Sequence, residues 1–441
     1  MFRIACFCLV IGIAAPAWSQ VEPSAYGGSY DLDSEHMQTP PPVSKGAYPS
    51  LSSSEERSNF ISGGVSASGS YTDNLMLVGT KKVADYYYNV VPTISLDRRT
   101  PRHSESVHYG AGFRFYQNTT DFNAIDQDGS AEFTYRFTPY TALIITDTVT
   151  QNSNSYGGGN FLGSGGVSGA PGSTNQAFIE PYANRLNNAT SAGLEYQFSK
   201  NAMIGASGMY SFLHFSADSL LPALSDQDTA GGNAFYSRRF GKSYGGLTYQ
   251  FSKYITHPFP SYTVSNTVFG FFTHYFTRTV SVSVLGGPEH YTSWSQNNGK
   301  SGAWTPAAQG SVGWQVKRAS LAANVVHIVS GAGGLVGTFH SDTGGGSVHM
   351  MVTPKWSAGA HVDYSRYKNL TTAPQLFQYF PGGTTIAGGI QAQRSLREWL
   401  ALDAEYAHFH QNYGNVTNEV MQDTNQFIVG ISCQFHKPLG R

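Results

Sequence analysis

The sequence predicts an all-β fold: a single transmembrane, antiparallel, up-and-down β-barrel of about 18 strands, with 16 as the alternative count. Three observations predict this fold. Apolar residues recur at every second position from Phe60 to near the end of the chain, the connections alternate between short and long, and charged residues make up only 12% of the composition. A period of two places successive side chains on opposite faces of a strand, as in a two-sided barrel wall.

The composition argues against a set of soluble domains. Soluble domains carry about 25% charged residues, whereas this chain has 12%, together with 14% aromatic residues and 49 glycines in 441 residues. After the N-terminal segment, no run reaches the roughly 18 consecutive apolar residues of a membrane helix. In a membrane barrel, each apolar lipid-facing residue of a strand is followed by a polar residue that faces the lumen. This alternation explains the composition. The net charge of −1 gives no indication of a nucleic-acid partner.

The N-terminus is predicted to be a cleaved signal peptide, residues 1–19. Arg3 precedes an apolar run from Ile4 to Ala15, and small residues follow near a cut after Ala17 or Ser19. That order is typical of secretory signals, and the run is too short to span a bilayer. Two cysteines lie inside the apolar run, which disfavours lipidation. Cys433 is then the only mature cysteine, so an intramolecular disulfide is excluded.

Residues 20–59 are predicted to be a flexible periplasmic leader. The stretch is rich in proline and serine and shows no sustained period, which is typical of segments without a packed core. Such a leader could contact a periplasmic protein, and we keep that contact as a hypothesis.

The two-residue period predicts the strands of a barrel over residues 60–436. From Val107 to Tyr116, for example, apolar residues alternate with histidine, glycine and arginine. The predicted strands lie near 60–72, 86–97, 106–118, 129–138, 140–150, 187–199, 201–215, 229–240, 243–255, 262–276, 279–292, 304–316, 319–330, 344–353, 355–367, 383–394, 398–411 and 424–436.

The connections between these strands alternate in length. Tight turns such as Gly241–Lys242 alternate with long connections such as 73–85, 119–128 and 151–186. Bacterial barrels have short periplasmic turns and long external loops. The longest loop, 151–186, holds a glycine-rich stretch, which we expect to be a surface loop. Folding inward as a constriction or plug is the alternative.

The last strand is expected to close the barrel. Between Asn425 and Phe435 the residues Phe427, Val429 and Ile431 share one face, which we expect to contact lipid. Pairing back to the strand at Phe60–Tyr71 would leave no open edge in the hydrocarbon. Residues 437–441 are expected to form a periplasmic tail. Aromatic residues near strand ends are expected to form a membrane-interface girdle: Trp294, Trp304, Trp356, Trp399, Tyr140 and Tyr196.

By these features the chain after residue 59 resembles a Gram-negative outer-membrane β-barrel of the porin-like class, and it is similar to uncharacterised β-barrel porins. The resemblance lies in the architecture and in no sharp motif, so it carries no functional residues over. It implies a location in the outer membrane of a Gram-negative bacterium, with outer-membrane lipid as a partner.

Several charged residues fall on the face predicted to line the lumen: Arg114, Glu132, Arg136, Glu195, Asp363, Asp403 and Glu405. They could form a selectivity lining along a wet path. A solvated inner wall, or a salt-bridge lattice that stiffens the barrel, explains them equally well.

Other motifs indicate no catalytic residue, metal or cofactor. His408 and His410 share one strand face, but no third metal ligand is in view. The Gly-Lys-Ser at residue 241 lacks the glycine and the helix of a phosphate-binding loop. No Gly-x-Ser-x-Gly signature occurs, and we therefore expect no enzyme.

The predicted function is a porin-like channel for passive or weakly selective diffusion of small hydrophilic solutes. The alternative is a barrel for secretion or anchoring of exported polysaccharide or of a periplasmic partner, with residues 20–59 making the contact. The solute and the oligomeric state do not follow from the sequence.

Overall fold

The computed structural model describes residues 59–75, 82–152, 184–216, 225–257, 261–277, 279–295, 299–331, 338–370, 382–413 and 421–439. The predicted signal peptide, nearly all of the leader and the glycine-rich stretch of loop 151–186 lie outside these residues. No helix among the described residues is long and apolar enough to cross a membrane.

The described residues form 18 strands and one short 3-10 helix, Thr120–Phe122. The strands are β1 (Phe60–Thr72), β2 (Asp85–Arg99), β3 (His103–Tyr116), β4 (Ala124–Thr138), β5 (Thr141–Asn152), β6 (Arg185–Ser199), β7 (Ala202–Phe215), β8 (Asp226–Phe240), β9 (Ser243–His257), β10 (Ser261–Tyr275), β11 (Val280–Ser295), β12 (Gly299–Val316), β13 (Ala319–Gly331), β14 (Thr338–Thr353), β15 (Trp356–Asn369), β16 (Gly382–Arg397), β17 (Leu400–Tyr413) and β18 (Met421–Pro438).

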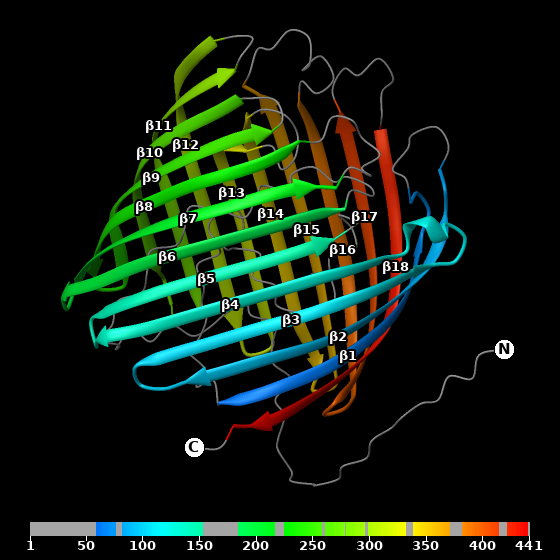
Figure 1. The fold of residues 1–441 in the computed structure, drawn as a ribbon. Coiled ribbons are helices and arrows are strands. Elements are labelled where there is room, and N and C mark those ends of the chain that lie inside the picture. Colours follow the sequence, from blue (N-terminus) through cyan, green and yellow to red (C-terminus); the bar gives the residue numbers. More distant parts are fainter. Residues whose placement is uncertain are drawn as a thin grey trace.

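The strands close into one up-and-down barrel (Figure 1). Every strand pairs antiparallel with its neighbours in the sequence, and β1 also pairs with β18. In the closing register Val65 faces Cys433 and Tyr71 faces Phe427. The structure therefore confirms the all-β barrel, the count of 18 and the closing strand. β18 reaches Pro438, so the first two residues of the predicted tail continue the strand.

The two faces of the wall differ as the alternation predicts. Outward-facing apolar side chains are exposed, with Val429 at 64% and Phe435 at 63%. The inward face carries small polar side chains, such as Ser281 and Ser283, that are covered by their neighbours. An apolar exterior around a polar interior is the pattern of a barrel whose solvent is lipid on one side and water on the other.

Aromatic side chains near the periplasmic turns face outward, as predicted for a girdle. Trp356 and Trp399 are exposed, and each lies under an arginine: Arg394 is 5.3 Å from the Trp356 ring, and Arg397 is 5.9 Å from the Trp399 ring. Rings at the headgroup level with cations above them are typical of a membrane interface.

The strands extend further at their external ends than the sequence predicts. β4 begins at Ala124 rather than 129, β12 at Gly299 rather than 304, and β14 at Thr338 rather than 344. The predicted loop 119–128 is therefore too long. Beyond the apolar band both strand faces carry polar residues, so the alternation that identifies a strand disappears although the backbone ladder continues.

Gly246 in β9 allows the inner wall to pack closely. A Cβ at this position would lie 1.9 Å from the Tyr236 carbonyl oxygen and 2.8 Å from the Phe271 ring. We expect Gly246→Ala to lower the free energy of unfolding by about 3 kcal/mol, because overpacking displaces the neighbouring backbone. Urea unfolding in lipid vesicles measures the change. Gly270→Ala is the control, since its nearest contact is at 3.9 Å; equal effects of the two variants would contradict the packing argument.

Candidate functional site

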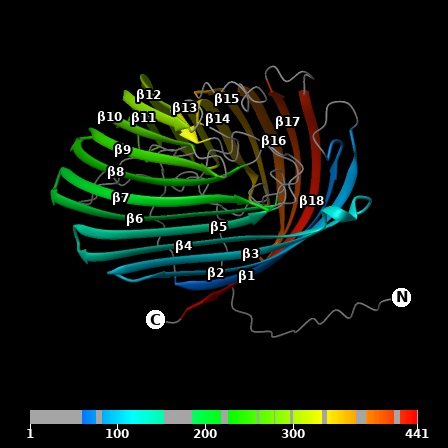
Figure 2. The same cartoon turned by 45° about the horizontal axis from the view of Figure 1, so that its top comes forward.

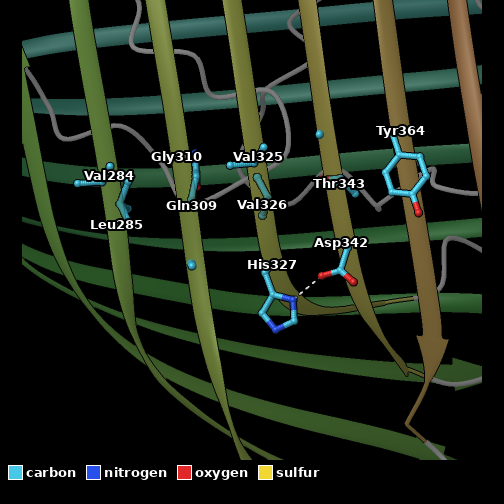
Figure 3. Close-up of a pocket in the computed structure, with 12 residues that line it drawn as sticks. Val284, Leu285, Gln309, Gly310, Val325, Val326, His327, Asp342, Thr343 and Tyr364 are labelled. Atoms are coloured by element: carbon cyan, nitrogen blue, oxygen red, sulfur yellow. Dashed lines mark hydrogen bonds and ion pairs between the residues drawn. The ribbon is translucent and has the colours of Figure 1, made fainter.

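The barrel wall has a seam between β12 and β13. The ladder between these strands runs from Val316 opposite Ala319 up to Ala308 opposite His327 and then ends. Beyond that point β12 pairs only with β11, and β13 pairs only with β14. In Figure 3 the strand that carries Val325 and Val326 turns aside at His327. In the described part of the chain, no backbone ladder therefore joins β12 to β13 in the external half of the wall.

Pro306 explains where the ladder ends. In β12 the Gln315 amide donates to Thr279 beside β11, and amides in a strand alternate in direction. Even-numbered residues of β12 therefore direct their amides toward β13. The next hydrogen-bonded pair after Ala308 and His327 would join Pro306 to Val329, and proline has no N–H to donate.

The Val329 amide has a different partner, the carboxylate of Glu289 on β11. The distance from the Val329 nitrogen to Glu289 Oε2 is 3.1 Å. Glu289 Oε1 accepts a hydrogen bond from the Ser265 hydroxyl at 2.5 Å. The Glu289 side chain is only 2% exposed. One buried carboxylate thus joins the inner wall to β13, and charge-assisted bonds of this kind are stronger than neutral ones.

The external ends of β13 and β14 lie inside the barrel. We name Ile328–Gly331 and Thr338–Ser341 the inner hairpin. Thr338 donates from its hydroxyl to Thr263 Oγ1 on β10 at 2.7 Å, and Ile328 packs against Phe269, Phe271, Leu285 and Ala307. Figure 2 shows the yellow end of β13 inside the curve of β10–β12.

The tip of the inner hairpin reaches further along the inner wall. A Cβ at Gly331 would lie 2.1 Å from Gln227 Nε2 on β8 and 3.0 Å from the Tyr254 ring on β9, so a larger residue there would have to displace the Gln227 side chain. The hairpin therefore covers inward-facing residues of four strands, β8 to β11, and takes up part of the lumen. The sequence analysis considered a constriction in loop 151–186, whose glycine-rich stretch lies outside the described residues; in the described part of the chain, this hairpin narrows the lumen.

All seven predicted lumen residues lie on the inward face of their strands. Along each strand they alternate with the exposed apolar residues, which lie on the outward face. They do not form one site. Arg114, Glu132, Arg136 and Glu195 lie on β3, β4 and β6, whereas Asp363, Asp403 and Glu405 lie on β15 and β17.

Arg114 is covered rather than open to the lumen. Its side chain is 1% exposed, and its Nη2 lies 2.5 Å from Asp126 Oδ2. The guanidinium carbon is 5.6 Å from the centre of the Tyr87 ring, and the Tyr116 ring packs against Tyr87. These contacts favour the stiffening role over the selectivity role for this residue.

Glu132 and Asp363 are exposed on the inner wall, where water in the lumen can reach them. Asp363 leans along the wall: a Cβ at Gly345 would lie 2.3 Å from its carboxylate. Asp403 leans over Gly430 in the same way. Glu405, two positions along β17, is largely covered. Glu132 and Asp363 are therefore the two predicted acids best placed to act on a passing ion.

The structure adds charged inward residues that the sequence analysis did not select, among them Asp126 and Glu289. Acidic residues outnumber basic ones on the inward face of the described strands. The acids are Asp85, Asp97, Asp126, Asp128, Glu132, Glu195, Glu289, Asp363, Asp403 and Glu405, and the bases are Arg99, Arg114, Arg136, Arg185 and Arg239. Glu289 falls in a predicted strand, so an alternation count that keeps every ionisable residue would have found it, whereas Asp126 falls in a stretch that was predicted to be a loop.

The two histidines of β17 bond across to β18. His408 Nδ1 lies 2.9 Å from Asn425 Oδ1, and His410 Nδ1 lies 2.6 Å from Asp423 Oδ1. Among the described residues, no three His, Cys, Asp or Glu side chains are grouped so that they could hold a metal ion. These histidines serve cross-strand pairing in the structure.

A closed wall of 18 antiparallel strands, apolar outside and polar inside, defines a porin-like β-barrel of the Gram-negative outer membrane. Comparison with protein-family models and with curated proteins finds no match. Solved structures of similar architecture include Pseudomonas aeruginosa OccK2 (OpdF) in complex with glucuronate, which is 10% identical with a TM-score of 0.43 over 85% of this chain and 98% of that chain.

Two further solved structures are similar to this chain. Pseudomonas aeruginosa OprD is 9% identical with a TM-score of 0.42 over 86% of this chain and 96% of that chain. Acinetobacter baumannii OccAB4 is 8% identical with a TM-score of 0.41 over 87% of this chain and 100% of that chain. At these identities and scores the likeness concerns the fold alone.

Proposed function

We propose that this protein is an outer-membrane channel, without enzymatic activity, for passive and weakly cation-selective diffusion of small hydrophilic solutes. The observation that carries the proposal is the polar, acid-rich inner face of an 18-strand barrel. Barrels of 16 to 18 strands are wide enough to leave an aqueous lumen. Hydroxyl and carboxylate groups along that lumen replace part of a solute's hydration shell.

The charge balance supports a preference for cations. Inward acids exceed inward bases in the described strands, and Arg114 is neutralised by Asp126 and does not face water. A wall of one sign in a confined aqueous path raises the local concentration of counter-ions. The inner hairpin adds a limit on solute size, because it fills the lumen beside β8–β11.

Single-channel conductance of the refolded mature protein in a planar bilayer tests the proposal. Steady conductance steps support a channel, and a folded protein that never conducts overturns it. The same recording without residues 156–172 tests whether that stretch, which lies outside the described residues, also limits the flow. A rise in conductance on deletion would indicate that it folds inward.

The secretion or anchoring function stays the second candidate, with the proline- and serine-rich residues 20–59 making the contact to a periplasmic partner. Deleting residues 22–56 separates the two functions. Loss of polymer export with an intact conductance would favour secretion, whereas unchanged export would reject it.

We expect Glu132→Gln combined with Asp363→Asn to weaken cation selectivity. Both carboxylates are exposed to the lumen, so their removal lowers the negative potential along the path. The permeability ratio of potassium to chloride should fall roughly twofold, as measured by the reversal potential in a salt gradient. Glu105→Gln is the matched control, since Glu105 lies on the outward face beside His103. An unchanged ratio in the double variant would contradict the charge argument.

A further inference from the structure

Two carboxylates lie next to each other on the inward face of β17, far from any inward arginine. Asp403 and Glu405 are two positions apart, so both side chains leave the same face of the strand. β17 lies between β16 and β18 in the wall (Figure 1). In the described residues, β17 and β18 carry no inward lysine or arginine, and the inward arginines lie on β2, β3, β4, β6 and β8.

The Glu405 carboxylate is buried and has no hydrogen-bond partner. The residue is 6% exposed, and neither Oε1 nor Oε2 has a partner among the described residues. Asp403 Oδ2 is likewise buried without a partner in this part of the chain. Burying a carboxylate is costly unless a cation balances it. The unpartnered oxygens, rather than the mere closeness of two acids, therefore point to a cationic ligand.

Polar side chains that face the lumen lie on both sides of Glu405. Gln391 on β16 lies directly opposite Glu405 and is exposed. It leans away toward β15, where a Cβ at Gly359 would lie 2.8 Å from its Nε2. Asp403 is half-buried and leans the other way, over Gly430 on β18. An ion in the lumen can therefore pass from Asp403 to Glu405 without crossing an apolar layer.

We propose that Asp403 and Glu405 bind one calcium ion taken up from the lumen. Oxygen ligands lie about 2.3–2.6 Å from calcium, which accepts irregular geometry. Cα atoms two residues apart on a strand are about 7 Å apart, so one ion can bridge both carboxylates. Water and the Gln391 amide oxygen, after rotation of that side chain, complete the shell. Magnesium fits less well, because it demands a near-octahedral shell and keeps its waters.

This site goes beyond diffusion through the lumen, because the ion is held in the wall rather than passing along it. Isothermal titration calorimetry tests the proposal, with calcium chloride added to the refolded mature barrel after treatment with a chelator. We expect one site per chain with a dissociation constant on the order of 10⁻⁴ to 10⁻³ M, and about tenfold weaker binding of magnesium. No saturable calcium binding would overturn the site, and equal affinity for magnesium would overturn the assignment to calcium.

Two variants assign the binding to this pair of acids. Glu405→Gln and Asp403→Asn keep the shape of the side chains, and each should weaken calcium binding about tenfold because the ligand charge falls. Asp97→Asn is the matched control, since Asp97 is an inward acid on β2 whose Oδ1 already accepts a bond from the Ser106 hydroxyl at 2.8 Å. Unchanged binding in both site variants would contradict the proposal. An equal loss in the control would also contradict it, because it would indicate diffuse binding to the acidic lumen.

A second readout requires no variant to fold. Excess calcium should raise the urea midpoint of unfolding of the unchanged protein in lipid vesicles, because a ligand that binds only the folded state stabilises it. An equal midpoint with and without calcium would overturn the site. Conductance recorded on the same samples separates the two proposals: a barrel that conducts without binding calcium overturns this site alone, and one that binds calcium without conducting overturns the channel alone.

Discussion

Replacing Glu289 with alanine is expected to release the inner hairpin and widen the channel. The variant removes the carboxylate that accepts the Val329 amide and the Ser265 hydroxyl, and it leaves both donors without that acceptor inside the wall. β13 has no ladder to β12 at this height, so the Glu289 carboxylate is the group that holds the Val329 backbone to the wall, beside the Thr338–Thr263 bond and the packing of Ile328. We expect single-channel conductance to rise roughly twofold, with added current noise, because the open lumen of a barrel this size is aqueous.

A disulfide lock gives the matching control. Thr263 and Thr338 approach to 2.7 Å between their hydroxyl oxygens, so cysteines at both positions can bridge wall and hairpin. Cys433→Ser removes the native thiol first. Oxidation should return the Glu289→Ala channel to its original conductance, and reduction should reverse this. A folded Glu289→Ala channel with unchanged conductance and noise would show that the carboxylate does not hold the hairpin.

The strand count and the two faces followed from the sequence because they depend on a local property, the period of two. The closing register is one example: Phe427, Val429 and Ile431 share a face by position alone, and pairing with β1 places that face outward. The external strand ends did not follow, because Asp126 and Lys300 lie in stretches that lack the alternation of the membrane region.

The seam could not be derived from periodicity, because it is a failure of pairing rather than of strand formation. A signal was nevertheless present. Pro288 and Pro306 fall in the consecutive predicted strands 279–292 and 304–316, and the structure places them opposite each other. Prolines in the middle of sheets mark edges or irregularities. Locating the edge, however, requires the register. The register shows that the backbone nitrogen of Pro306, which carries no hydrogen, points toward β13.

Arg114 shows the corresponding limit for the candidate site. The alternation placed it correctly on the inward face, but its burial depends on Tyr87 and Tyr116, which come from a neighbouring strand and from the end of its own. A lumen residue open to water and one covered by neighbours have the same sequence pattern. Their energetic consequences differ widely, since only the covered charge loses its hydration.

Arg114→Met is therefore expected to destabilise the barrel strongly. The variant leaves the Asp126 carboxylate, whose side chain is 14% exposed, without its cation. Removing one partner of a buried ion pair costs about 3–5 kcal/mol. Urea unfolding in lipid vesicles, followed by tryptophan fluorescence, measures the loss. Arg238→Met is the control on the outer face, where the guanidinium lies 5.4 Å from the Phe240 ring, and it should cost about 1 kcal/mol or less.

The double variant Arg114→Met with Asp126→Leu separates the two roles considered for Arg114. Removing both charges leaves no uncompensated group, so most of the lost stability should return. Ion selectivity should stay unchanged throughout, because neither the covered guanidinium nor its paired carboxylate faces the aqueous path. A shift in the permeability ratio without a loss of stability would instead assign Arg114 to the selectivity lining. The pair of Arg114 and Asp126 would then not contribute to the stability of the wall.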